Sequence, residues 1–201
     1  MNFFNPFRPV SGLGNDHVGE LRLEDFRKGV AKTVIIARGA EGNVLLYREL
    51  ADCLGPDQPV YGLQSRGLDG TSTPASTIEE MASRYVEEII RHDPRGPYHL
   101  GGYCMGGALT IAAAVHVPEI AAAVCLYGIP PRDFADPANI RVPFQGHFAT
   151  QDDWCTPEAV AELEARMRAH GAAPEIFHYD AAHAFCNEKR PEVYDAKCAG
   201  E

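Results

Sequence analysis

The sequence lacks a long apolar run, an excess of basic residues and a recognisable secretory signal. No stretch approaches the ~18 consecutive apolar residues that a membrane-spanning helix needs. The formal net charge of −10 argues against nucleic acid or an anionic membrane as a partner, because both bind basic surfaces. The opening residues, MNFFNPFRPV, contain prolines and no apolar core of a signal peptide. We therefore expect a cytoplasmic protein with no nucleic-acid or membrane partner.

The sequence also lacks motifs that would bind a cofactor or a metal ion and the motif of a serine nucleophile. The segment GLGNDHVG lacks the third glycine of a dinucleotide-binding fingerprint, and no clear strand precedes it. The six cysteines show no CxxC spacing, and most of them are expected to be small buried side chains. No serine stands in a G-x-S-x-G pattern. We expect neither a cofactor nor a metal ion.

From Thr33 onward, short apolar runs alternate with amphipathic segments, whereas residues 1–32 form a poorly defined N-terminal segment. The alternation predicts an α/β fold with a mostly parallel sheet and helices on both faces. A chain of 201 residues can bury one substantial core, so we expect residues 1–201 to form a single domain. Strands are expected at 33–37, 59–64, 97–103, 120–129, 142–150 and 175–179. Helices are expected at 43–54, 78–90, 105–116 and 157–170, with a short one at the end of the chain. Ser76 and Glu79 have the spacing of a capping box at the start of the helix 78–90.

One of these strand-to-helix turns carries a cysteine between glycines, in the sequence GGYCMGG. Gly102, Cys104 and Gly106 have the spacing of a nucleophile elbow, in which small neighbours let a sharply turned side chain project above the sheet. The helix that follows would stabilise a thiolate and offer the Met105 N–H to an oxyanion. The alternative is a buried cysteine whose glycines serve only the close packing of strand and helix.

A base and a carboxylate follow the cysteine in the chain order that this fold class uses. Asp152 follows the carboxyl end of the predicted strand 142–150, and His183 follows the strand 175–179. Both are expected at the sheet edge that holds Cys104, although Asp153 could exchange roles with Asp152. The other histidines considered are expected to be packed within strands or to lie near helix ends, where charge complements the helix dipole: His147, His178, His92, His116 and His170.

From Gly102 to the end, the chain resembles the dienelactone hydrolase family of the α/β-hydrolase fold. The resemblance is carried by GYCMGGA at the elbow, HFATQDDWCTPE around the acid and DAAHAF around the base. It implies a catalytic triad of Cys104, His183 and Asp152. It also implies an acidic residue in an early loop, where Glu41 stands, and two arginines that hold a substrate carboxylate.

Arg66 occupies a plausible place for one of these arginines, while Asn187 stands where the other would be. For Glu41 and for Arg66, a charged loop residue that is only solvated is at least as good an interpretation. Residues 33–99 resemble instead the thioesterase domains of peptide and polyketide synthetases, through the runs EGNVLLYRELADCLGPDQPVYGLQSRGLDG and STIEEMASRYVEEIIR. Those domains carry a different sequence at the loop 38–42. An amide near Ala40 is expected to be the second oxyanion donor.

The residues and the resemblance together predict a hydrolase of small esters or lactones that works through an acyl-cysteine intermediate. One alternative is a thioesterase that releases acyl groups from a pantetheine carrier. Only PPRDFADPANIR separates two predicted strands where such enzymes insert a lid, so we expect no large lid and an open site for a small-molecule substrate. A second alternative is a hydrolase-fold protein that binds a ligand without turning it over.

Overall fold

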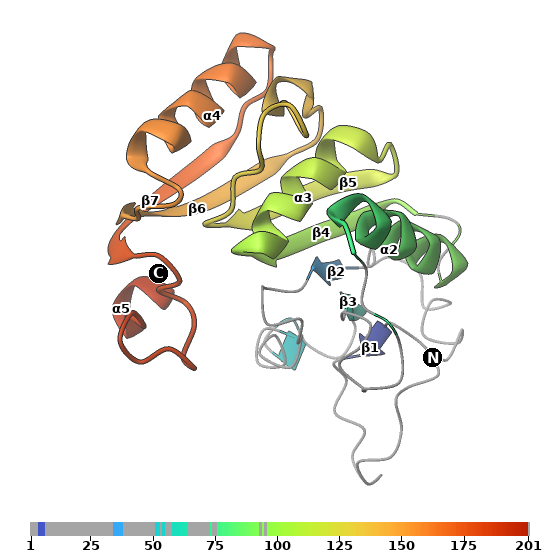
Figure 1. Cartoon of the computed structure of the whole chain (residues 1–201), viewed down its shortest axis with the longest axis horizontal. Coiled ribbons are helices and arrows are strands. Elements are labelled where there is room, and N and C mark those ends of the chain that lie inside the picture. Colours follow the sequence, from blue (N-terminus) through green and yellow to red (C-terminus); the bar gives the residue numbers. More distant parts are fainter. Residues whose placement is uncertain are drawn as a thin grey trace, which may run out of the picture. The chain divides into compact units, whose positions relative to one another are not determined.

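A computed structural model describes residues 4–6, 34–37, 51–52, 54, 58–63, 73, 76–92, 94 and 96–200. The chain divides into two compact units, Met1–Leu100 and Gly101–Glu201 (Figure 1). Among the described residues, none of the helices is long and apolar enough to cross a membrane. The expectation of a single domain remains a prediction.

The described residues of the first unit include three short strands and a long helix. In its sheet β3 (Val60–Leu63) lies between β1 (Phe4–Pro6), which is antiparallel to it, and β2 (Val34–Ala37), which is parallel. The helix α2 (Ile78–His92) buries Met81, Tyr85 and Ile89, which recur every fourth residue and so share one face.

The start of α2 differs by one residue from the capping box that the sequence suggests at Ser76 and Glu79. Thr77 Oγ1 accepts a hydrogen bond from the Glu80 N–H at 3.1 Å. The Glu80 carboxylate in turn accepts from the N–H and the hydroxyl of Ser76, at 2.9 and 3.0 Å. The capping pair is therefore Thr77 and Glu80, and it satisfies an otherwise unpaired amide of the first turn.

The second unit is built around parallel strands in the order β4, β5, β6 and β7, of which β4 begins at the end of the first unit. Neighbouring strands pair in parallel from β5 to β7. This confirms the predicted α/β-hydrolase arrangement of a mostly parallel sheet with helices. The elements in chain order are β4 (Tyr98–Tyr103), α3 (Met105–His116), β5 (Ile120–Leu126), the 3-10 helix η3 (Pro137–Asn139), β6 (Phe144–Gln151), α4 (Pro157–Ala169), β7 (Glu175–Ala182) and α5 (Ala196–Ala199).

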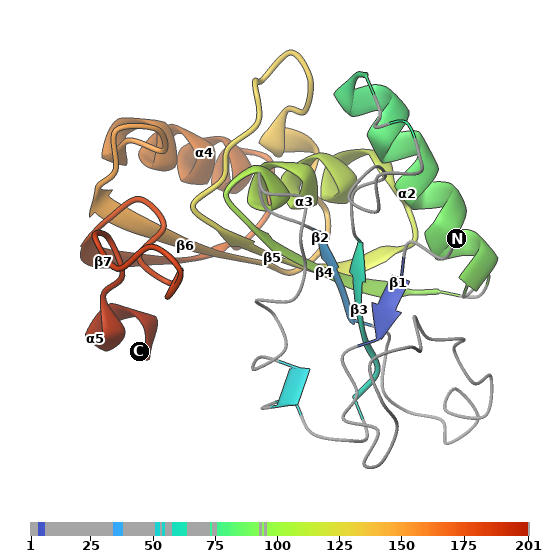
Figure 2. The same cartoon turned by 60° about the horizontal axis from the view of Figure 1, so that its bottom comes forward.

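Helices α3 and α4 lie over one face of β5, β6 and β7 (Figure 2). Side chains of these two helices and of the sheet form one apolar cluster, in which Ile111 of α3 and Met167 of α4 are fully buried with Phe148 of β6. Cys125 of β5 is also fully buried, and burial raises the pKa of its thiol. Of the cysteines that the structure describes, Cys125, Cys155 and Cys198 are buried and Cys104 and Cys186 are half-buried, all as free thiols.

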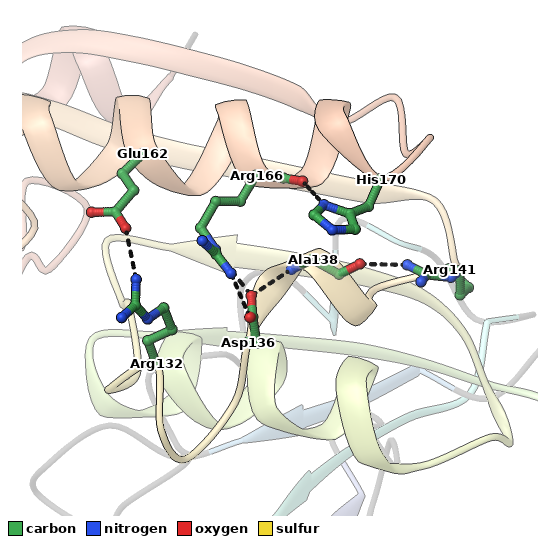
Figure 3. Close-up of polar contacts among 7 residues, drawn as sticks. All are labelled: Arg132, Asp136, Ala138, Arg141, Glu162, Arg166 and His170. Carbon is green, nitrogen blue, oxygen red and sulfur yellow. Dashed lines mark hydrogen bonds and ion pairs between the residues drawn. The ribbon is translucent and has the colours of Figure 1, made fainter.

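The segment between β5 and β6 is held against α4 by polar contacts (Figure 3). Arg166 of α4 binds both carboxylate oxygens of Asp136, at 3.1 and 2.5 Å, and Asp136 also accepts the Ala138 N–H at 3.0 Å. Arg132 lies 3.6 Å from Glu162 of α4. The segment contains only η3, as expected for a chain without a large lid.

Candidate active site

Cys104 occupies the tight turn between β4 and α3, in a backbone conformation that residues other than glycine rarely adopt. Its φ is 54° and its ψ is −123°. The Cys104 N–H donates to the carbonyl of Leu126 at the end of β5, and its own carbonyl accepts from the Ala108 N–H in α3. A strained residue held by hydrogen bonds on both sides is typical of a nucleophile elbow.

Glycines around Cys104 allow this close approach. A Cβ on Gly102 would meet the carbonyl group of Gly106, with its carbon at 2.5 Å. A Cβ on Gly128 would collide with the carbonyl oxygen of Cys104 and come within 2.5 Å of the Ala108 nitrogen. Both positions therefore have to be glycine for the turn to keep its shape.

Asp152 and His183 follow neighbouring strands at equivalent positions. Gln151, the last residue of β6, pairs with Ala182, the last residue of β7, so the next residue of each strand lies at the same edge. The pairing contains an irregularity between Ala149 and Gln151, where β7 has one residue more than β6. This bulge brings His183 level with Asp152.

The carboxylate of Asp152 is buried and has a partner on each oxygen. Its Oδ2 accepts a hydrogen bond from His183 Nδ1 at 2.7 Å. Its Oδ1 accepts from the backbone N–H groups of Trp154 and Cys155, at 2.7 and 2.9 Å. The side chain of Asp152 is wholly inaccessible to solvent, so these hydrogen bonds replace the hydration that a carboxylate needs.

His183 connects the carboxylate to the cysteine. Burial disfavours its charged form, but hydrogen bonds to the side chains of Cys104 and Asp152 and the charges of both groups outweigh burial and raise the pKa of His183. The structure thus brings together Cys104, Asp152 and His183 within the second unit. An imidazole between a carboxylate and a thiol can move a proton to and from sulfur.

Two aromatic rings flank this imidazole, and sequence reasoning missed both. Tyr127, which directly follows β5 and has a φ of 37°, lies edge-on with its ring centroid 5.1 Å from that of His183. The indole of Trp154 lies 5.6 Å away at an interplanar angle of 32°. The signal was available, since Tyr127 follows a predicted strand and Trp154, the only tryptophan, comes two residues after Asp152.

Cys155 is a second thiol near the site. Burial, together with the charges of Asp152 and Cys104, raises the pKa of Cys155 to about 12. It therefore stays protonated near neutral pH and is a poor nucleophile.

The remaining predicted residues have different outcomes. Met105 is the first residue of α3, directly after Cys104. Ala40, Glu41 and Arg66 lie outside the described residues. Asn187 is buried, and its side-chain oxygen accepts the Lys189 N–H at 3.0 Å, so it stabilises a turn.

The competing acid and bases also differ from the pair that the structure joins. The side chain of Asp153 is exposed, whereas Asp152 holds His183. His147 is half-buried within β6, as expected of a residue packed in a strand. The expectation that His178 is packed is wrong, because it is exposed on β7, the last strand of the described sheet.

Comparisons with known proteins identify similar sequences and similar structures. Malpinin synthetase of Mortierella alpina is 39% identical over 120 residues, which are 60% of this chain and 2% of that protein. Among solved structures, a candidate dienelactone hydrolase of Klebsiella pneumoniae superposes with a TM-score of 0.67 at 22% identity, covering 86% of this chain and 83% of its own. The enol-lactonase of Burkholderia xenovorans LB400 gives 0.62 at 14% identity, covering 83% of this chain and 89% of its own.

The chain thus spans a small fraction of its curated synthetase relative, and the two solved structures establish its fold. The sequence profile of the dienelactone hydrolase family matches residues 75–201, which contain Cys104, Asp152 and His183. The elbow at Cys104 and the hydrogen bond between Asp152 and His183 therefore lie in the part of the chain that the profile covers. The protein belongs to the dienelactone hydrolase family.

Proposed function

We propose that the protein hydrolyses small esters or lactones through a Cys104, His183 and Asp152 triad and an acyl-cysteine intermediate. The observation that carries this proposal is the imidazole of His183, which binds the buried carboxylate of Asp152 at 2.7 Å and the side chain of Cys104. Cys104 occupies a strained elbow, which is a costly conformation to retain without a function.

In the first half of the reaction, His183 accepts the thiol proton of Cys104 and the sulfur attacks the carbonyl carbon of the substrate. The negative charge that develops on the carbonyl oxygen is stabilised by the Met105 N–H and, as the sequence suggests, by an amide near Ala40. The carbon–oxygen bond to the leaving alcohol then breaks, and His183 returns the proton to that oxygen. The acyl group stays on sulfur.

In the second half, His183 takes a proton from water, and the hydroxide attacks the acyl-cysteine carbonyl. The carbon–sulfur bond breaks, the acid leaves and Cys104 regains its proton. Asp152 accepts the Nδ1–H throughout, so the lone pair of the neutral imidazole stays on Nε2, where the proton is exchanged. A thiolate is a good leaving group, which favours activated esters and enol lactones over amides.

The test uses p-nitrophenyl acetate with the wild type, Cys104→Ser and Cys104→Ala. The proposal requires that Cys104→Ala abolishes turnover and that mass spectrometry of the wild type finds the acetyl group on Cys104. Cys186→Ala is the matched control, because Cys186 is another half-buried free thiol and burial raises its pKa to about 12. Equal rates for wild type and Cys104→Ala would leave a hydrolase-fold binding protein as the better description.

A thioesterase acting on a pantetheine-bound acyl group is the second candidate, and the identity to Malpinin synthetase favours it. Against it stands the short segment between β5 and β6, which Asp136 and Arg166 fasten to α4. A panel of lactones, aryl esters and acyl-pantetheine thioesters separates the two candidates by the ratio of their kcat/KM values. We expect the aryl esters and lactones to be the better substrates.

A further inference from the structure

The side chain of Trp154 is exposed to an unusual degree for its size. Its exposed fraction is 80%, whereas the next most exposed large apolar side chains among the described residues, Ile90 and Leu54, reach 46% and 44%. A tryptophan that leaves so much apolar area in water loses the stabilisation that burial would give. Such a side chain commonly marks a binding surface.

Trp154 lies beside the Asp152 and His183 pair. The backbone N–H of Trp154 donates to Asp152 at 2.7 Å, which ties the residue to the carboxylate of the triad. The ring lies 5.6 Å from the imidazole of His183, and it is exposed whereas His183 is largely covered. Trp154 therefore forms an outer wall beside the proposed general acid.

The chemistry of the reaction identifies the part of the substrate that meets this wall. His183 protonates the leaving oxygen, so the leaving group must lie next to its imidazole when the bond breaks. The acyl group lies on the other side of the carbonyl carbon, attached to Cys104. A group that departs beside His183 passes the indole of Trp154.

Accepting the proposed function, we propose that Trp154 determines specificity by stacking on the leaving group, and that this group is an uncharged aryl or conjugated enol. A planar π system gains binding free energy by stacking on indole, and a small alkyl group does not stack in this way. An anionic leaving group is disfavoured by the exposed carboxylate of Asp153, the neighbouring residue.

The kinetic test keeps the acyl group constant and changes only the leaving group. For Trp154→Ala, kcat/KM for 2-naphthyl acetate should fall about three- to tenfold, while kcat/KM for 2,2,2-trifluoroethyl acetate should change less than about twofold. Trp154→Phe should keep most of the naphthyl activity. The deacylation rate of Trp154→Ala should equal that of the wild type with either substrate. The leaving group has departed before this step, and both substrates give the same acetyl-enzyme.

Phe177→Ala is the control variant, because Phe177 is an exposed aromatic residue of the same unit that stacks on His147. Phe177→Ala should leave kcat/KM for both substrates at the wild-type value. An equal loss for both substrates in Trp154→Ala, together with a displaced acid limb of the pH profile, would show that the indole acts only on His183 and would overturn the proposal.

A binding measurement separates this proposal from the proposed function. Calorimetric titration of Cys104→Ala with 2-naphthol and with cyclohexanol needs no chemistry, and thermal unfolding verifies that each variant is folded. We expect 2-naphthol to bind more tightly than cyclohexanol, and Trp154→Ala to remove the difference. Equal binding of both alcohols would overturn the role of Trp154 even where Cys104 proves to be the nucleophile.

Discussion

The second unit contains two half-buried imidazoles, each flanked by aromatic rings, and of the two it is His183 that binds a carboxylate. His147 stacks on Phe177 at 5.1 Å and lies 5.8 Å from Tyr179, much as His183 lies between Tyr127 and Trp154. The partners of the two rings differ in charge. His147 binds the hydroxyl of Tyr179 and the amide oxygen of Gln145, which are neutral, whereas His183 binds the carboxylate of Asp152.

The pKa values of the two imidazoles move in opposite directions for this reason. Burial lowers the pKa of His147, because its neutral partners do not compensate for the lost hydration of the cation. Burial also acts on His183, but Asp152 and Cys104 outweigh it and raise its pKa. The charge of the hydrogen-bond partner, rather than the aromatic surroundings, distinguishes a candidate base from a structural histidine.

The most drastic test replaces each imidazole in turn. His183→Gln should lower kcat/KM for p-nitrophenyl acetate by about 10⁴-fold, because glutamine cannot move a proton between sulfur, the leaving oxygen and water. His147→Gln should leave the rate within about twofold of the wild type. Comparable losses in the two folded variants would remove the distinction between the clusters.

Removing the charge of one partner should have the next largest effect. Asp152→Asn should lower kcat by about 10³-fold, because the amide cannot hold His183 in the required tautomer. The carboxylate raises the pKa of His183, so its removal should move the acid limb of the kcat/KM profile to lower pH. A limb that stays in place would mean that Asp152 does not set the charge of this imidazole.

The reverse change gives the second cluster a charged partner. His147 Nε2 lies 3.0 Å from the side-chain oxygen of Gln145, so Gln145→Glu places a carboxylate at nearly the same position. The pKa of His147 should rise above its value in the wild type, as measured by NMR titration of the ring protons. Esterase activity should be unaffected, and an unchanged pKa would show that burial alone controls this histidine.

The smallest expected effect comes from the hydroxyl of Tyr179, which lies 2.7 Å from His147 Nδ1. Tyr179→Phe removes one buried hydrogen bond and should lower the free energy of unfolding by about 1 kcal/mol in urea titration. The kcat/KM for p-nitrophenyl acetate should stay at the wild-type value. A large loss of activity would instead connect this cluster to the site.

Local sequence was sufficient to predict the parts of the site that depend on the order of elements. The helix expected at 105–116 is α3, and the elbow residues that precede it stand where the glycine spacing puts them. The order of nucleophile, acid and base directed attention to Asp152 and His183, which the structure joins. Parallel strands place their carboxyl ends at one edge, which is why the order of elements indicated that Asp152 and His183 lie together.

Features that depend on register and on side-chain direction could not be predicted. The capping pair of α2 moved by one residue to Thr77 and Glu80, and β7 extends to Ala182, beyond the expected end at residue 179. Tyr127 approaches His183 from a turn in which its own φ is 37°, and Trp154 is exposed, and periodicity carries no information about either feature.

The extra residue in β7 has a consequence for how the gene can change in length. Deleting either residue 180 or residue 181 would make the pairing regular and still leave Ala182 opposite Gln151, whereas an insertion directly after Ala182 would move His183 away from Asp152. Insertions in the turn between α4 and β7, at residues 170–174, would leave this alignment intact. Changes in length should therefore be tolerated before β7 and at its extra residue, and should disturb the site where they fall between Ala182 and His183.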